Sequence, residues 1–412
     1  MKRVALLCMG LAVGAAGAAE AQLTMQMTNG WSFTFSGNVN AFAIYESTSE
    51  SGGTLLVNAP GGLVGIGGKG FNVRTGLLPA FAVFDAKGKE GNTDLGVHFG
   101  FAPGIQCGAD ATGANVHDCF GLGTAGARID MRQVYLTVGG SWGQILAGRE
   151  IGLFQRQNIL TDQTLFGIGA TGGINSIGTT LGRIGFGYVY PNFVAQMTFS
   201  TPAGRPGQLS IGIFEPAGLG GDAGTVYGET KVPRVEAEGT WKSGDIMVWV
   251  NGTVQNARDV ALDVSKTAAG AGGGFRFGRA QFSVTGSGYW GKGIGTTLQF
   301  NGIGGGGALG GLGVGDDGEL RKSYGFIGQV TFTPANSKVT VGGSYGSSYL
   351  KSTDAEAPFK TENSLISGGI YYQATKSLRV VGEGNYAWTK EHEAGTDKNK
   401  TFAPAVGLML FF

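Results

Sequence analysis

The chain has 412 residues, a formal net charge of +1 at pH 7 and only 14% charged residues. So small a charge excess argues against a nucleic-acid partner. Glycine accounts for 79 residues, far above the usual ~7%. After the N-terminus no apolar run reaches the roughly 18 residues of a transmembrane helix.

The N-terminus has the pattern of a secretory signal peptide, predicted over residues 1–21. Lys2 and Arg3 precede an apolar run too short to span a bilayer, and Ala19-Glu20-Ala21 forms a small-x-small cleavage site. The mature protein is expected to form one domain over residues 22–412.

Two cysteines remain after the predicted cleavage, Cys107 and Cys119. An exported chain meets an oxidising compartment, so we expect a disulfide that closes the short loop between them. Two free loop thiols are the alternative. Together with His117 they fall short of the about four ligands of a zinc site, so we expect no metal and no cofactor.

Alternation of apolar and polar residues predicts strands along the whole mature chain, about sixteen in all. The expected strands, in order, cover residues 32–45, 71–85 (with a kink at Pro79), 93–102, 132–138, 144–149, 183–190, 193–199, 232–241, 246–255, 268–278, 281–290, 322–333, 339–350, 365–374, 378–389 and 401–412. A further strand over 209–214 could be added, and about 14 to 18 strands remain open.

The breaks between these strands alternate between one short turn and one long loop. An antiparallel up-and-down barrel produces this pattern, because all short turns fall at one rim and all long loops at the other. A soluble sandwich has crossing connections instead. The sequence therefore predicts an all-β transmembrane barrel with both termini at the short-turn rim.

The strand faces favour lipid outside and water inside. In the expected strand over 183–190, Ile184, Phe186 and Tyr188 share one face and Arg183 lies on the other. Tyr and Trp near strand ends suit the aromatic girdles at membrane interfaces. The strand over 132–138 obeys the pattern less well, since Gln133 and Thr137 share the face of Tyr135.

The chain ends on an aromatic residue. Leu408, Leu410 and Phe412 alternate along one face of the last strand. A barrel needs this strand to close against the first, because no sheet edge can face lipid. A terminal aromatic after alternating apolar residues also resembles the outer-membrane assembly signal of Gram-negative barrels, which we assign to these three residues.

The chain resembles the general trimeric porins of Gram-negative outer membranes. The motifs that carry the resemblance are Arg132-Gln-Val-Tyr135, Gly148-Arg149, Thr161-Asp162 and Gly182-Arg183. The resemblance implies a water-filled channel for passive diffusion of small hydrophilic solutes, and a long third loop folded into the lumen. It also implies an outer-membrane location, a homotrimer, and contact with the lipid bilayer, lipopolysaccharide and the barrel-assembly machinery.

The same resemblance predicts a constriction where wall arginines face acidic groups on the third loop. Such an arrangement creates a transverse field that polar solutes tolerate and apolar solutes do not. The acidic residues usual in the family are missing from residues 163–167, and the arginine excess favours anions. The expected constriction residues are Arg132, Arg149, Arg183, Asp162, Arg74, Arg128 and Asp130.

Three other functions stay open on the sequence. The chain could be a substrate-specific channel, although lumen faces rich in Gly, Thr, Ser and Arg favour a general pore. It could be a plugged structural or adhesin barrel. An enzymatic barrel is disfavoured, because no nucleophile elbow, zinc motif or paired-carboxylate arrangement accompanies its histidines.

Overall fold

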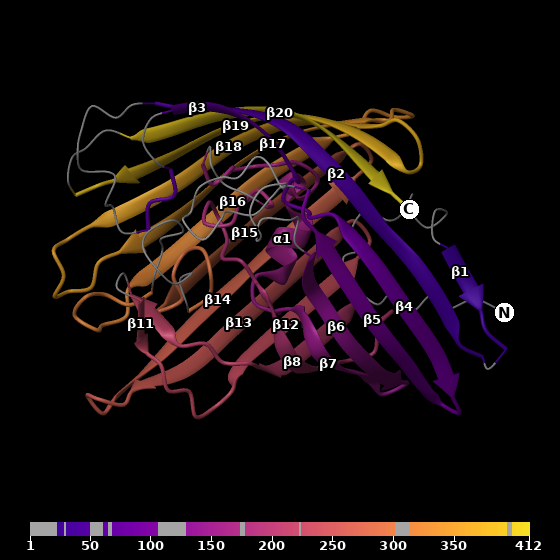
Figure 1. The fold of residues 1–412 in the computed structure, drawn as a ribbon, viewed down its shortest axis with the longest axis horizontal. Coiled ribbons are helices and arrows are strands. Elements are labelled where there is room, and N and C mark those ends of the chain that lie inside the picture. The colour runs from indigo at the N-terminus through magenta and orange to yellow at the C-terminus, as the bar shows by residue number, and fades with distance from the viewer. Residues whose placement is uncertain are drawn as a thin grey trace, which may run out of the picture.

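The computed structural model describes residues 23–28, 30–49, 61–64, 68–105, 129–173, 178–221, 224–300, 313–393 and 398–412. The predicted signal peptide, Cys107, Cys119 and Arg128 lie outside the described residues. The described residues form a closed barrel of antiparallel strands (Figure 1).

The wall strands follow one another in sequence and pair mostly with their chain neighbours. They are β2 (Ser32–Thr48), β3 (Gly68–Arg74), β4 (Phe81–Glu90), β5 (Thr93–Pro103), β6 (Ile129–Gly140), β7 (Gly143–Ile151), β8 (Phe193–Ser200), β9 (Gly207–Phe214), β12 (Arg234–Ser243), β13 (Ile246–Asp259), β14 (Val264–Arg279), β15 (Phe282–Lys292), β16 (Lys322–Phe332), β17 (Val339–Lys351), β18 (Lys360–Gln373), β19 (Leu378–Glu391) and β20 (Asn399–Phe411).

The sheet has 18 strands, and 17 of them make up the 16 positions of the wall. The short strand β1 (Leu23–Gln26) only extends the sheet beside the start of β2. Strands β3 and β4 pair with successive halves of β2, so together they form one interrupted wall strand. The first wall strand closes against the last, with Asn38 opposite Phe411. The predicted barrel of about sixteen strands is confirmed.

One strand prediction needs correction, and a strand that the sequence left open takes its place in the count. Residues 183–190 form turns and isolated bridges inside the barrel rather than a wall strand. Residues 207–214 form β9, which pairs with β8 and β12, so the further strand that the sequence left open over 209–214 is present. Alternation misled because Phe186, Tyr188 and Val189 are buried within the lumen, where apolar residues are as favourable as on a lipid-facing strand.

The interrupted wall strand bends inward where the sequence predicted a kink at Pro79. The Asn40 amide on β2 donates to the carbonyl of Leu78 at 2.9 Å, and its carbonyl accepts from the Gly76 amide at 2.9 Å. Leu77 and Leu78 are buried in the interior. Residues 75–80 therefore leave the sheet and contribute to the contents of the barrel.

The outer surface of the barrel carries large apolar side chains on successive strands. Val250 is 67% exposed, Val406 63% and Leu408 54%. Trp142, Trp241 and the aromatic residues of neighbouring strand ends also lie exposed near the rims. Such an apolar belt with aromatic edges is typical of a barrel surrounded by lipid.

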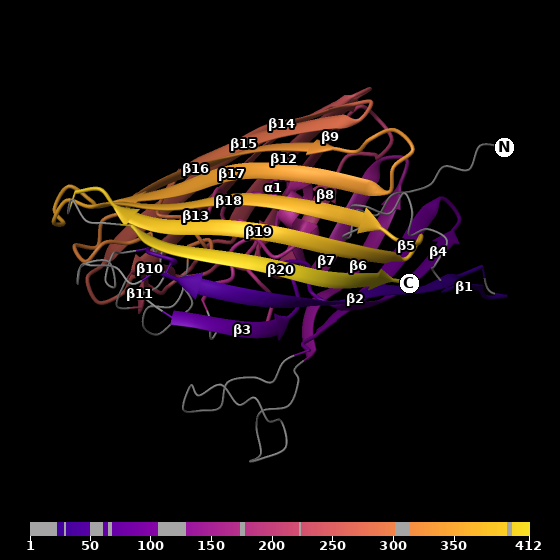
Figure 2. The ribbon, with the colours of Figure 1, turned by 90° about the horizontal axis from the view of Figure 1, so that it is seen from above.

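Among the described residues, no helix is both long enough and apolar enough to cross a membrane. The regular helices of the described residues are short and lie in one loop, L3 (residues 152–192), which follows β7. They are α1 (Arg156–Thr161) and the 3-10 helix η3 (Gln163–Phe166). Figures 1 and 2 show α1 within the ring of strands.

Two further loops pack inside or across the long-loop rim. L4 (residues 215–233) contains the small hairpin of β10 (Leu219–Gly221) and β11 (Gly224–Tyr227), and L6 covers residues 293–321. Leu219 of L4, Phe300 and Val314 of L6, and Phe154 of L3 form one buried apolar cluster. A second, larger cluster joins L3 to residues 77–81 and to the wall. The interior is therefore substantially filled by packed loops.

Candidate functional site, the loop-filled lumen

L3 crosses the barrel and is attached to two different walls. The first attachment is at β12. A carboxylate oxygen of Glu236 accepts hydrogen bonds from the backbone amides of Leu153, at 2.7 Å, and Phe154, at 2.9 Å. Glu236 is fully buried, and its other oxygen lies 3.3 Å from Arg234 Nε. The start of L3 is thereby bound to a charged pair on β12.

The helix α1 adds side-chain contacts to the same wall. Arg156 donates to Glu238 of β12 at 2.5 Å, and Gln157 donates to the same carboxylate at 3.1 Å. Trp249 Nε1 of β13 donates to the side chain of Asn158 at 2.8 Å. The bonds made by Gln157 and Trp249 are buried and that of Arg156 is partly buried, so an unpaired polar group at this wall would be costly.

The second attachment is at the opposite part of the wall, on β16 and β19. The Gln163 amide donates to Gln329 Oε1 at 2.7 Å. Farther along L3, Glu383 Oε1 accepts from the amides of Ile168, at 3.0 Å, and Gly169, at 2.7 Å. A buried wall glutamate thus binds two successive loop amides at each end of the crossing.

The structure brings together two of the predicted constriction residues, Asp162 and Arg183. Arg183 Nε lies 3.9 Å from Asp162 Oδ1, and both side chains are 0% exposed. The guanidinium also donates to the Leu365 carbonyl at 2.9 Å, and the Tyr188 hydroxyl donates to Asp162 at 3.0 Å. Both ends of this pair therefore belong to L3, and neither is on the wall.

Burial governs the protonation of this pair. Loss of hydration raises the pKa of Asp162, while the charge of Arg183 and hydrogen bonds from Thr164 act in the opposite direction. Burial likewise lowers the pKa of Arg183, opposed first by the charge of Asp162. Each charge therefore depends on the other, and a change in one would disturb the packing of L3.

Arg74 lies at the end of β3 and holds the far side of L3. Its guanidinium donates to the carbonyls of Gly178, at 3.1 Å, and Thr171, at 3.1 Å. The side chain is 2% exposed. Arg74 is thus a third attachment between wall and loop, made through backbone carbonyls.

Arg132 and Asp130 lie at the long-loop rim, away from the Asp162–Arg183 pair. Arg132 Nε donates to Asp130 Oδ2 at 2.7 Å, and its side chain is only partly buried. A register shift between β5 and β6 falls at this point. Beyond it Gln133 faces the interior, because a bulge moves the following residues to the opposite face.

Arg149 needs a correction. The resemblance placed it at the constriction inside the barrel, but along β7 it shares a face with Ile145 and Ala147. That face is the outer one, since Ile145 is exposed and Arg149 pairs in register with exposed Ala195 of β8. Alternation along a strand shows which residues share a face but not which face is inside. Both faces of β7 carry apolar residues, so composition does not decide it either. Its neighbour Glu150 is the inward residue, where it accepts hydrogen bonds from Gln133.

The wall carboxylates were not among the residues predicted from the sequence. Arg234, Glu236 and Glu238 alternate on one face within the expected strand over residues 232–241, so parity could have identified them as one charged face. Their partners, the amides of L3, lie about eighty positions earlier in the chain and have no sequence signature. Glu383 lies within the expected strand over 378–389, where nothing in the sequence marked it as a partner of L3.

Several buried polar atoms of the β12–β13 wall have no hydrogen-bond partner among the described residues. These atoms are Arg234 Nη2, Glu238 Oε2, Asn251 Nδ2 and Gln255 Nε2. Native proteins rarely leave such atoms without a hydrogen-bond partner, so this part of the lumen is suited to ordered water or a polar solute.

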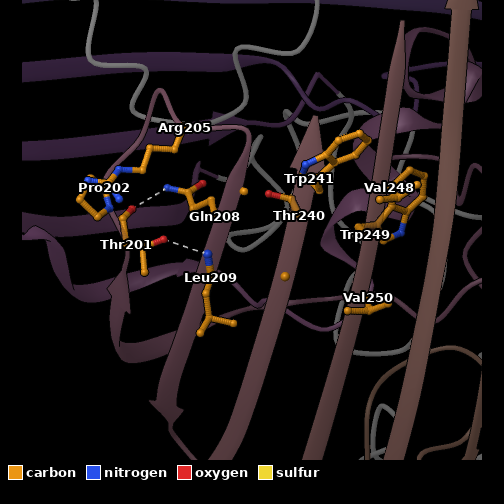
Figure 3. Close-up of a pocket in the computed structure, with 12 residues that line it drawn as sticks. Thr201, Pro202, Arg205, Gln208, Leu209, Thr240, Trp241, Val248, Trp249 and Val250 are labelled. Carbon is orange, nitrogen blue, oxygen red and sulfur yellow. Dashed lines mark hydrogen bonds between the residues drawn. The ribbon is translucent and has the colours of Figure 1, made fainter. Parts of the chain in front are cut away.

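A pocket at the short-turn rim lies elsewhere (Figure 3). It is bordered by Arg205, Gln208, Leu209 and Trp241 of the β8–β9 connection, β9 and β12. Thr201 accepts from the amide of Leu209 at 2.9 Å. Leu209 and Trp241 are exposed on the outer surface, so the pocket borders the outside of the barrel rather than the lumen.

The described part of the chain holds no cluster of three or more His, Cys, Asp and Glu side chains able to hold a metal ion. Two separate histidine–carboxylate pairs occur, at His98 with Asp85 and at His392 with Glu362. The first faces the lumen near β4 and β5, and the second lies on the outer surface near the long-loop rim.

The last residue of the chain is bound into the closing seam. The Phe412 amide donates to the Gly37 carbonyl at 3.0 Å, and the Gly37 amide donates to the Phe412 carbonyl at 2.8 Å. The rings of Phe412 and Phe35 lie 5.3 Å apart. Leu408 and Leu410 point outward. The three residues predicted as an assembly signal thus form the outer face and end of the closing strand.

No protein-family model matches the sequence, and no curated protein matches it. Solved structures do match. The outer membrane channel DcaP of Acinetobacter baumannii aligns with a TM-score of 0.64 and 14% identity, over 94% of this chain and 99% of that one. An anion-selective porin from Comamonas acidovorans gives 0.59 and 12%, over 93% and 100%. OmpF of Salmonella typhi, solved in complex with daunomycin, gives 0.56 and 10%, over 94% and 100%. The chain therefore has the fold of the outer-membrane porins.

Proposed function

We propose that the chain is an outer-membrane channel through which small hydrophilic solutes and ions diffuse along a water-filled path beside L3. One observation carries this proposal. The closed barrel has apolar side chains outside, while its wall places Glu236, Glu383 and Arg74 inside. A barrel in lipid needs the first arrangement, and an aqueous path is the usual reason for the second.

The constriction would lie where L3 crosses between its two attachments. Charged groups that border it are Glu238 and Arg156 on one side and the Asp162–Arg183 pair on the other. We infer that the partly exposed Arg156 acts on permeating solutes, while the fully buried Asp162–Arg183 pair and Arg74 hold L3 in position. Arg132 and Asp130 would act earlier, at the mouth. Arg128 stays a candidate for the same mouth.

A substrate-selective channel is the second candidate, and the interior favours it over a plugged adhesin. Three buried apolar clusters narrow the lumen. The unpaired polar atoms of Asn251 and Gln255 offer hydrogen bonds beside that narrow region. A narrow path with few unsatisfied polar groups discriminates among solutes more strongly than a wide one.

The test is flux through the purified protein in liposomes, measured for sugars, amino acids and organic acids of increasing size. A general channel predicts rates that fall smoothly with size and rise linearly with concentration. A selective channel predicts one class that saturates. A correctly folded barrel without flux for any solute or ion would refute the channel proposal and favour a structural role.

The remaining inferences concern location and assembly. We infer export by the signal peptide over residues 1–21, removal of that segment, and insertion of residues 22–412 by the barrel-assembly machinery that reads Phe412. We also expect a homotrimer. Cross-linking of the purified protein would test the trimer, and truncation of Phe412 would test the assembly signal. The proposed channel needs no catalytic group.

A further inference from the structure

Three polar side chains lie side by side on the inner wall, near the long-loop ends of the last three strands. Register pairs Asn363 of β18 with Thr389 of β19, and Thr389 with Asn399 of β20. Each of them is at most 1% exposed. The Thr389 hydroxyl also donates to Asn363 Oδ1 at 2.6 Å. We call these three residues the polar row.

The polar row binds a segment of L1, the loop between β2 and β3. The segment covers residues 61–64 and has the sequence Gly-Gly-Leu-Val. Asn363 contacts it twice. Its side-chain carbonyl accepts from the Leu63 amide at 3.0 Å, and its side-chain nitrogen donates to the Gly61 carbonyl at 2.6 Å. One asparagine thus pairs with both a donor and an acceptor of the same backbone.

The other two members of the row continue this pattern. Thr389 Oγ1 accepts from the amides of Leu63, at 3.1 Å, and Val64, at 3.0 Å. Asn399 Nδ2 donates to the Val64 carbonyl at 3.1 Å. All of these bonds are made to main-chain atoms. The polar row is therefore built to recognise a peptide backbone.

The side chains of the segment enter an apolar pocket beside the row. Leu63 and Val64 are 9% and 8% exposed. Their neighbours come from L3 and from the wall, and they are Ala170, Phe186, Leu365 and Ala387. Residues 61–64 therefore lie between L3 and the wall, on the long-loop side of the lumen.

The polar row differs from the wall groups that hold L3. Those groups are charged, namely Glu236, Glu383 and Arg74. The polar row is neutral, and hydrogen bonds between neutral groups are weaker than bonds that involve a charge. A molecule with the same backbone groups could therefore replace residues 61–64 more easily than any ligand could replace L3.

The segment also leaves part of the row unused. Asn399 Oδ1 is buried and has no hydrogen-bond partner among the described residues. The same holds for Thr361 Oγ1, which lies two positions before Asn363 on the inner face of β18. Buried polar atoms are rarely left without partners. These two atoms give the site capacity for a ligand that makes more hydrogen bonds than residues 61–64 do.

We propose that the polar row is a binding site for short apolar peptides at the mouth of the channel, and that residues 61–64 occupy it in the absence of a peptide. Backbone hydrogen bonds would supply affinity, and the apolar pocket would select the side chains. A sugar lacks apolar side chains, and a small ion lacks both features. The inference rests on the proposed function, since it names a class of solute for that channel.

The test is isothermal titration calorimetry of the full chain, folded in detergent, with the peptide acetyl-Gly-Gly-Leu-Val-amide. The variant L63G/V64G removes the side chains of the internal occupant and leaves the row intact. Adding N363L/T389V to that variant removes the acceptors of the row without a change in competition. Adding T340V instead is the matched control, because Thr340 bonds to another threonine, Thr333, at 2.8 Å near the short-turn rim.

Two further measurements separate this site from others. The same peptide, methylated at its leucine and valine nitrogens, keeps both side chains and loses both donors. Hydrogen exchange in the wild type reports the amides of Leu63 and Val64, which lose their acceptors when a peptide replaces them. Neither measurement depends on conduction.

We expect L63G/V64G to bind the peptide about tenfold more tightly than the wild type, because two buried apolar side chains no longer compete. Adding N363L/T389V should weaken binding at least about tenfold, and adding T340V should change nothing. The methylated peptide should bind at least about tenfold more weakly than the unmethylated one. Saturating peptide should speed exchange at Leu63 and Val64.

Absence of peptide binding in L63G/V64G would overturn the proposal. Equal affinity for the methylated peptide would do the same, and this comparison stays valid if N363L/T389V prevents folding. Binding without faster exchange at Leu63 and Val64 would place the peptide at another site. A silent channel that binds the peptide would refute the proposed function alone, and a conducting channel that does not bind it would refute only this site.

Discussion

The two attachments of L3 use the same device in different electrostatic settings. At β12, Glu236 accepts two successive loop amides while Arg234 lies 3.3 Å away, and Arg156 pairs with the neighbouring Glu238. At β19, Glu383 accepts two successive amides, supported by Tyr371 at 3.1 Å and Asn385 at 2.8 Å, which are neutral. Two loop amides are therefore enough to attach L3 to a wall carboxylate. A charged partner beside that carboxylate makes the attachment more costly to break.

The largest expected effect is that of Glu236→Ala. The substitution leaves Arg234 buried without its carboxylate and two loop amides without an acceptor, so we expect a loss of about 3–5 kcal/mol in stability. Chemical denaturation of the folded barrel and limited proteolysis of L3 would measure it. Glu236→Gln keeps an acceptor oxygen and should lose clearly less. Because Glu236→Gln still removes the charge that faces Arg234, wild-type stability in that variant would contradict the role of charge at β12.

Glu383→Ala should lose less stability, because it leaves two loop amides without an acceptor but removes the carboxylate of no buried cation. We expect about 1–3 kcal/mol, the cost of buried groups left unsatisfied. The same denaturation measurement, made beside Glu236→Ala, tests the comparison directly. If Glu383→Ala proves the more damaging of the two, the ranking by charge is wrong.

A smaller effect is expected from Trp249→Phe, which sharpens the comparison within the β12–β13 wall. The variant keeps most of the buried ring but removes the donor to Asn158, at 2.8 Å. We expect a loss of about 1 kcal/mol, with protease sensitivity rising at α1 and not at residues 163–169. An unchanged stability would mean that water replaces the indole donor.

The smallest effect concerns a pair outside L3, between L6 and the loop L7 (residues 352–359). Burial alone would raise the pKa of Glu356, but hydrogen bonds and charge from Arg321 outweigh it and lower the pKa to about 2. The unfolded value is near 4.5. The pair's contribution is therefore complete above about pH 4.5 and is lost as pH falls through about 2. Hydrogen exchange in L7 should rise only in that window. A rise near neutral pH would contradict the assignment.

The sequence predicted the wall better than the contents of the barrel. Alternation and the sequence of short turns and long loops depend on local chemistry, so the barrel, its rims and the terminal strand followed from the residues. Residues 183–190 were wrongly predicted as a wall strand, because an apolar face packed inside the lumen alternates in the same way as one that faces lipid. Arg149 was predicted wrongly because alternation along a strand shows which residues share a face but not which face is inside.

The attachments of L3 could be predicted only in part. Arg183 and Asp162 were expected to face each other, and they do, but as two members of one loop. Glu236 and Glu383 bind backbone amides, which every residue carries, so no residue type on L3 identifies its partner. Contacts of this kind depend on how far a loop reaches across a closed barrel, and strand patterns do not encode that distance.

The central claim is that an aqueous path runs past L3 and is limited by it. Single-channel conductance in planar bilayers, compared between the wild type and a Glu236→Ala/Glu383→Ala double variant, tests it most directly. We predict small ohmic steps for the wild type and larger steps for the double variant, because L3 loses both attachments and leaves the path. Equal steps would contradict the role of L3, and silence in two correctly folded proteins would contradict the channel itself.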